Sequence, residues 1–141
     1  MSVTIYHNPD CGTSRNVLAV IEAAGYAPVV VPYLETGWTL DLLLELFADA
    51  GVTPRQALRE TKSPAKAMGL LEPGVSDERL LAAMLKDPVL VNRPFVVTEK
   101  GTKLCRPSER VLDLLERWPA GPFYKEDGAL MIDAEGHRMA G

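Results

Sequence analysis

A chain of 141 residues, of which 47% are hydrophobic, is long enough to bury one well-filled core. Its formal net charge of -4 excludes the broad basic surface that nucleic-acid binding or docking on an anionic membrane requires. We therefore expect a single domain over residues 1–141, without a nucleic-acid or membrane partner.

The N-terminus and the two cysteines indicate in which cellular compartment the protein is expected. Residues 1–7 lack the basic stretch and apolar core of a signal peptide, and no apolar run is long enough to span a bilayer. Cys11 and Cys105 lie far apart in the sequence and fit neither a disulfide framework nor a zinc site. They are typical of free thiols in a reducing compartment, so we expect a cytoplasmic protein.

The first third of the chain predicts two strands that alternate with two helices. Residues 3–6 are β-prone, and apolar residues at helical spacing follow until Gly25. The three valines at 29–31 predict a compact buried strand. Helical spacing returns over 40–47 and ends at Gly51.

Capping residues followed by proline or acidic residues predict a helical middle third. These helix starts are Thr53-Pro54, Ser63-Pro64 and Ser76-Asp77-Glu78. Residues 95–98 and 102–105 then flank a short Gly-containing connection that is typical of a hairpin, and a last helix starts at 107–109. The tail after Pro119 is rich in Gly and charge, and no element is predicted there.

This order, βαβ, then helices, then ββα, is that of thioredoxin with an addition. We expect an α/β, thioredoxin-like three-layer fold with a mixed four-stranded sheet and a helical insertion between the second and third strands.

Cys11 is the candidate nucleophile because it lies between the first predicted strand and the first helix. Unpaired N–H groups and the helix dipole at such a position stabilise a thiolate and also bind an oxyanion. Gly12 removes side-chain bulk beside this position, and Thr13 and Ser14 offer hydroxyls to it.

The residues after Cys11 exclude two related chemistries. Ser14 stands where a dithiol oxidoreductase has its second cysteine, so Cys11 has no local disulfide partner. A phosphatase-type loop needs an arginine at the sixth position after its cysteine, and Val17 and Val111 occupy those positions here.

Three arginines are candidates for an anion clamp. Arg59, Arg93 and Arg106 would bind a tetrahedral oxyanion through their guanidinium forks and lower the pKa of a nearby cysteine. His7, at the end of the first strand, could support the cysteine loop or cap it as a half-buried residue. Cys105 has the strand context of a buried structural thiol, although its neighbour Arg106 leaves a resolving role open.

Four segments of the chain resemble the glutaredoxin-dependent arsenate reductases. The signature loop of that family is similar to Tyr6-His7-Asn8-Pro9-Asp10-Cys11-Gly12-Thr13-Ser14-Arg15-Asn16. Residues 92–98, 101–109 and 125–128 also resemble the family, so the similarity extends along nearly the whole chain.

The resemblance implies an arsenate reductase, an oxidoreductase of arsenical resistance, with no bound cofactor and no metal. In this family Cys11 would attack arsenate, glutathione would add as co-substrate, and glutaredoxin would reduce the mixed species so that arsenite leaves. The implied catalytic residues are Cys11, Arg59, Arg93 and Arg106. The implied substrate-binding residues are Gly12, Thr13, Ser14 and Arg15, with support from His7, Asn8 and Pro94. Arg55 could compete with Arg59.

Two other functions are compatible with a thioredoxin-like chain. A redox-responsive regulator that binds RNA polymerase would use a second cysteine near Cys11, which the sequence lacks, although glutathionylation of one thiol remains open. A glutathione-linked oxidoreductase without an oxyanion substrate would not need three arginines. Asp10 is unfavourable for a thiolate if it points inward.

Two structural expectations follow. The pKa of Cys11 should lie below that of an ordinary cysteine. The Arg93-Pro94 bond should be cis, because thioredoxin-like folds place a cis-proline before the third strand.

Overall fold

The structure, a computed structural model, describes residues 1–140 and divides them into two compact units. The first unit joins residues 1–31 to the chain from Arg93 onward, and the second is the segment Pro32–Asn92. The elements of the first unit are β1 (Thr4–Tyr6), α1 (Gly12–Ala23), β2 (Val29–Val31), β3 (Phe95–Thr98), β4 (Gly101–Leu104), the 3-10 helix η2 (Ser108–Leu114), β5 (Phe123–Tyr124) and β6 (Leu130–Ile132). Those of the second are α2 (Tyr33–Thr36), α3 (Leu40–Ala50), α4 (Pro54–Ala57), α5 (Asp77–Lys86) and the 3-10 helix η1 (Pro88–Leu90).

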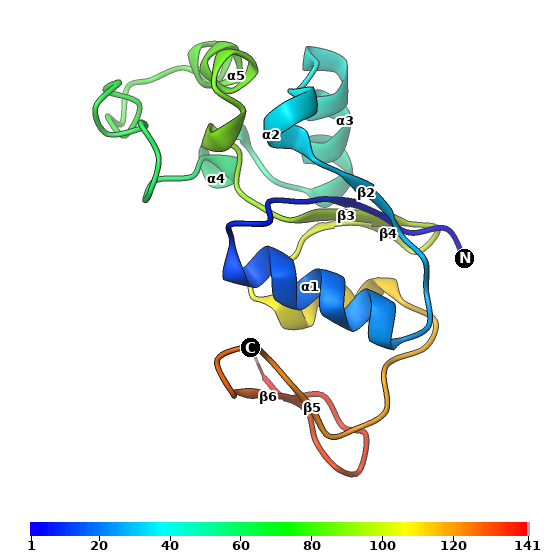
Figure 1. Ribbon diagram of the computed structural model, residues 1–141. Helices are drawn as coiled ribbons and strands as arrows, with labels where there is room; N and C mark the ends of the chain where they lie inside the picture. Colours follow the sequence, from blue (N-terminus) through cyan, green and yellow to red (C-terminus); the bar gives the residue numbers. More distant parts are fainter. Residues whose placement is uncertain (141) are drawn as a thin grey trace. The chain divides into compact units, whose positions relative to one another are not determined.

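The first unit is built on a mixed four-stranded sheet with the strand order β2-β1-β3-β4 (Figure 1). β1 pairs in parallel with β2 and antiparallel with β3, and β3 pairs antiparallel with β4. This topology confirms the thioredoxin-like fold with a mixed four-stranded sheet. It also confirms that a helical segment separates the second and third strands in the chain.

Alternation along β1 and helical spacing along α1 direct apolar side chains into one core. Ile5 and Val96 pair across β1 and β3, and both are buried against α1 residues such as Val17 and Ile21. α1 and η2 lie on the same face of the sheet (Figure 1). The helix predicted after 107–109 is therefore present, as a 3-10 rather than an α-helix.

The prediction of a buried strand at 29–31 was half wrong. The strand forms, but Val29 and Val30 have exposed fractions of 59% and 42%. The physical reason is position, because β2 pairs with β1 alone and is an edge strand of the sheet.

The tail after Pro119 contains elements that the sequence reading missed. β5 and β6 pair antiparallel as a two-stranded hairpin. Met131 and Ile132 on β6 are fully buried and belong to the same core as Ile5. Lys125, in the hairpin loop, forms a 2.6 Å ion pair with the buried Glu109 of η2.

In the second unit, capping residues fix the starts of three helices. Thr39 caps α3, Thr53 forms a capping box with Gln56 on α4, and Ser76 caps α5. The helix predicted at Ser63-Pro64 is absent. The chain there forms consecutive turns, and Gly69 adopts a left-handed conformation (φ 72°) that does not continue a helix.

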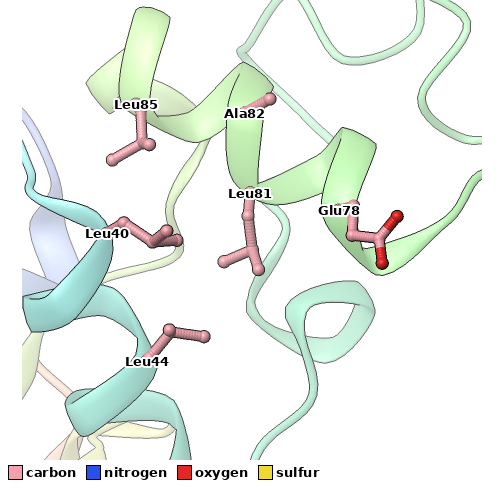
Figure 2. A pocket seen from close by; sticks show the side chains of 6 residues that line it. All are labelled: Leu40, Leu44, Glu78, Leu81, Ala82 and Leu85. Carbon is pink, nitrogen blue, oxygen red and sulfur yellow. The ribbon is translucent and has the colours of Figure 1, made fainter.

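The predicted apolar stripe of α3 is divided between the core and an open groove. Phe47 is buried, whereas Leu40 and Leu44 are exposed and face α5 across a groove of about 350 Å³ (Figure 2). Leu81 and Leu85 supply most of the opposite wall, with Glu78 at its edge. None of the helices in residues 1–140 has the length and hydropathy needed to span a bilayer.

Candidate functional site: a cysteine at a helix N-terminus

Cys11 is the N-cap residue of α1, in an extended conformation (φ -105°, ψ 121°). The preceding turn is held by Asn8, whose carbonyl accepts the Cys11 N–H at 3.1 Å and whose Oδ1 accepts the Asp10 N–H at 2.9 Å. The Arg15 N–H then donates to the Cys11 carbonyl at 3.0 Å and begins the helical ladder. The thiol therefore lies at the positive end of the helix dipole.

Ser14 joins the end of β1 to the start of α1. Its Oγ accepts the Asn8 N–H at 3.1 Å and lies 2.6 Å from Nδ1 of His7. Ser14, Asn8 and His7 are all buried. The hydroxyl that the sequence offered to a substrate is thus used within the loop. Asn8 and His7 thus form hydrogen bonds within this loop, and their support of a reaction at Cys11 stays a prediction.

The register of the sheet brings two arginines to the same edge as Cys11. The last residue of β1, Tyr6, pairs with Phe95 at the start of β3, and Phe95 pairs with Leu104 at the end of β4. Arg93, which precedes β3, and Arg106, which follows β4, are consequently neighbours of the loop after β1. The Arg93-Pro94 bond is cis, as predicted, and the Arg106-Pro107 bond is also cis.

Arg106 contacts both Cys11 and Arg93. One of its terminal nitrogens lies 3.7 Å from Cys11 Sγ and donates to the Arg93 carbonyl at 3.2 Å. The Arg93 side chain is buried, with an exposed fraction of 7%. Cys11, Arg93 and Arg106 therefore form one cluster within the first unit.

The environment of Cys11 favours the thiolate. Burial of the thiol, the largest effect, would raise its pKa, but several groups together outweigh it: the Ser14 backbone N–H, the charge and hydrogen bond of Arg93, and the hydrogen bond of Arg106. The pKa of Cys11 is lowered as a result, which confirms the expectation from the sequence.

Cys105 and His7 have different environments. Cys105 is fully buried, and the loss of hydration raises the pKa of its thiol to about 12. The pKa of His7 is lowered, first by burial and then by the charge of Arg15, against a smaller opposing effect of Glu22. The His7 ring is therefore predominantly neutral at pH 7.

The side chain of Arg15 lies at the rim of the loop, in an ion pair that the sequence analysis missed. Nε and one terminal nitrogen donate to the two carboxylate oxygens of Glu126 at 3.0 and 2.7 Å, and the other terminal nitrogen donates to the Pro9 carbonyl at 2.7 Å. A Cβ on Gly12 would lie 3.1 Å from Glu126 Oε1, so the glycine admits the carboxylate. The resemblance of 125–128 to the family was the one signal of this contact.

The remaining predicted residues have the following positions. Thr13 is half-buried on the first turn of α1, and Asp10 is exposed. Arg59 belongs to the second unit, where it is buried and its Nε donates to the Thr61 carbonyl at 3.0 Å. Its place in the anion clamp stays a prediction. Arg55 donates to two backbone carbonyls of the same unit, at Leu70 and Glu72, and these bonds occupy it structurally.

In the portion of the chain that the structure covers, residues 1–140, no group of three or more His, Cys, Asp or Glu side chains could hold a metal ion. The cluster instead offers a thiolate, two guanidinium groups and the N–H groups of a helix start. These groups define a thioredoxin-like protein with a cysteine of lowered pKa at a helix N-terminus, beside two arginines.

Comparisons with known proteins identify the family to which the chain belongs within this class. The model of the ArsC family matches residues 6–114, and the chain belongs to this family. It is 63% identical over 137 residues to arsenate reductase ArsI2 of Synechocystis sp., covering 97% of this chain and 98% of that protein. It is 49% identical to an arsenate reductase of Escherichia coli (strain K12), covering 98% of both. The solved structure of the arsenate reductase from Vibrio cholerae matches with a TM-score of 0.76 and 40% identity, over 82% of this chain and 98% of that one.

Proposed function

We propose that this protein is an arsenate reductase whose nucleophile is Cys11. The observation that carries the proposal is the contact of Arg106 with Cys11 Sγ at the N-terminus of α1, beside the buried Arg93. The names of relatives at 49% and 63% identity agree with it.

The first step joins the thiolate to arsenic. Cys11 Sγ attacks the arsenic atom of arsenate, a sulfur–arsenic bond forms, and one arsenate oxygen leaves as water. Arg93 and Arg106 hold the remaining oxygens by charge-assisted hydrogen bonds and stabilise the charge that develops on them. The family resemblance also implies a role for Arg59 in binding arsenate.

Glutathione and glutaredoxin supply the electrons. The glutathione thiol displaces a second oxygen as water and becomes bonded to arsenic. A glutaredoxin thiolate then attacks the glutathione sulfur, that sulfur–arsenic bond breaks, and its electron pair reduces arsenic(V) to arsenic(III). Water finally cleaves the bond to Cys11, which releases arsenite and the thiol. Two thiols are oxidised to one disulfide in each turnover, and no metal takes part.

The proposal is tested by measuring arsenite from the purified full-length chain with glutathione and glutaredoxin. We expect arsenite to accumulate with arsenate, and no glutathione to be oxidised when phosphate replaces it. Omission of thiol should stop turnover. Failure to form arsenite under these conditions, with the protein folded by circular dichroism, would overturn the proposal.

A further inference from the structure

The ion pair of Arg15 and Glu126 lies at the rim of the Cys11 loop and has no part in the steps above. Its two side chains are about half exposed, at 44% and 46%. The Glu126 backbone N–H also donates to Asn16 Oδ1 at 3.0 Å, which holds the hairpin loop against α1.

Both charged groups keep unused hydrogen-bonding capacity. A guanidinium group carries five N–H donors. Arg15 uses three of them in its hydrogen bonds to Glu126 and Pro9. A carboxylate can accept about four hydrogen bonds, and the Glu126 carboxylate accepts two from Arg15. The pair thus offers adjacent donors and acceptors, and an ion pair exposed to this extent exchanges partners readily.

The ion pair of Arg15 and Glu126 lies close to Cys11. The Arg15 N–H bonds to the Cys11 carbonyl, so Arg15 lies one helical turn after the nucleophile and on the same side of α1. The charge of Cys11 contributes to the raised pKa of Arg15, after the larger contribution of the hydrogen bond with Glu126. A ligand held by this pair would lie beside the thiolate.

A neutral pair of opposite charges is complementary to a zwitterion rather than to a simple anion. The carboxylate of Glu126 repels phosphate or arsenate from Arg15 but attracts an ammonium group. Glutathione carries an ammonium and a carboxylate on one carbon of its γ-glutamyl end, a short distance from its thiol.

We infer that Arg15 and Glu126 bind the γ-glutamyl end of the resolving glutathione, with its carboxylate on Arg15 and its ammonium on Glu126. The inference rests on the proposed function and adds a binding site for the second substrate to it. Bound in this way, glutathione presents its thiol at the rim of the Cys11 loop, close to the arsenic that is bonded to Cys11 Sγ.

The test compares glutathione with N-acetylglutathione, which has the same thiol and carboxylates but lacks the ammonium group. The thiol concentration that gives half-maximal arsenite formation should be about tenfold lower for glutathione in the unaltered protein. Glu126→Gln removes the charge that binds ammonium, so this preference should disappear. Glu135→Gln is the matched control, because Glu135 is exposed in the same C-terminal segment and the substitution changes the net charge equally.

The outcomes separate the site from other roles of Glu126. If Glu126→Gln merely loosened the hairpin, it would impair both thiols equally, and a preference that persisted would overturn the inference. The absence of any preference in the unaltered protein would also overturn it. If neither thiol supported arsenite formation, the proposed function itself would fall, and the two failures are therefore distinguishable.

Discussion

Cys11 and Cys105 contain the same thiol in two environments that move its pKa in opposite directions. Cys11 lies at a helix N-terminus beside two guanidinium groups, and Cys105 lies in a dry core. At neutral pH the thiolate is therefore favoured at Cys11 and disfavoured at Cys105, whose pKa is about 12 and whose exposed fraction is zero.

We predict that Cys11 reacts with iodoacetamide at a lower pH than an ordinary cysteine. Cations and N–H donors stabilise the thiolate, so its population persists as the pH falls below the usual value of about 8.5. Arg106→Gln replaces the charged guanidinium donor by a shorter, uncharged amide and should move the inflection upward by about one pH unit. The measurement is the alkylation rate against pH, and an inflection unchanged by Arg106→Gln would contradict the assigned contact.

The two cysteines should also differ in their effect on catalysis. We expect Cys11→Ser to abolish arsenate reduction and Cys105→Ser to retain most of it when glutathione and glutaredoxin are supplied. Cys105→Ser should instead lower the free energy of unfolding by about 1–3 kcal/mol, because it places a hydroxyl in the core.

Arsenite assays and urea unfolding of both variants check this prediction. An internal disulfide found by mass spectrometry after turnover, or an inactive but folded Cys105→Ser, would indicate an intramolecular dithiol relay instead.

Among the residues, the position of Cys11 at a helix N-terminus and its lowered pKa could be predicted from the sequence, but most of its surroundings could not. The prediction was possible because a loop between a strand and a helix has a fixed electrostatic consequence. The ion pair of Arg15 and Glu126 joins residues separated by 111 positions, and nothing in the local pattern of either residue indicates the other. The use of the Ser14 hydroxyl within the loop likewise depends on the side chain of His7 across the turn.

Among the elements, the best-predicted were those with a local stop signal. α1 ends next to Gly25, and α3 ends at Gly51, where left-handed glycines terminate helical spacing. β2 was predicted as a strand from its valines, but its exposure depends on which strand lies beside it. The β5–β6 hairpin was missed because its strands, of two and three residues, lie in a tail that is rich in Gly and charged residues.

The hairpin contributes to the core despite its small size. We predict that Ile132→Ala, which empties a fully buried position on β6, lowers the free energy of unfolding by about 2–4 kcal/mol. Tyr124→Ala is the control on the same hairpin, because Tyr124 is 58% exposed, and we expect it to cost less than about 1 kcal/mol. Urea denaturation measures both, and equal costs would show that β6 does not pack as described.

At the scale of the whole molecule, the chain was expected to form one domain, and the structure divides it into two compact units. A single domain can contain two compact units if both units unfold together, because a domain is defined by cooperative stability as well as by compactness.

The two tryptophans of the chain report on the two units separately. Trp38 stacks on Tyr33 in the second unit, with ring centroids 4.8 Å apart, and its Nε1 donates to the Pro88 carbonyl at 3.2 Å. Trp118 lies in the first unit, and its Nε1 donates to the Leu112 carbonyl at 2.9 Å. Each indole is fixed by contacts within its own unit, so its fluorescence should change when that unit unfolds.

We predict that one cooperative transition governs the whole chain. In Trp118→Phe, only Trp38 fluoresces, and its urea midpoint should coincide with the midpoint from circular dichroism of the same variant. In Trp38→Phe, the same agreement should hold for Trp118. Each substitution removes a hydrogen bond and shifts the midpoint by itself, so the comparison is made within a variant and not between the two. Separate midpoints for fluorescence and circular dichroism in either variant would mean that the units unfold independently, and the chain would then consist of two domains.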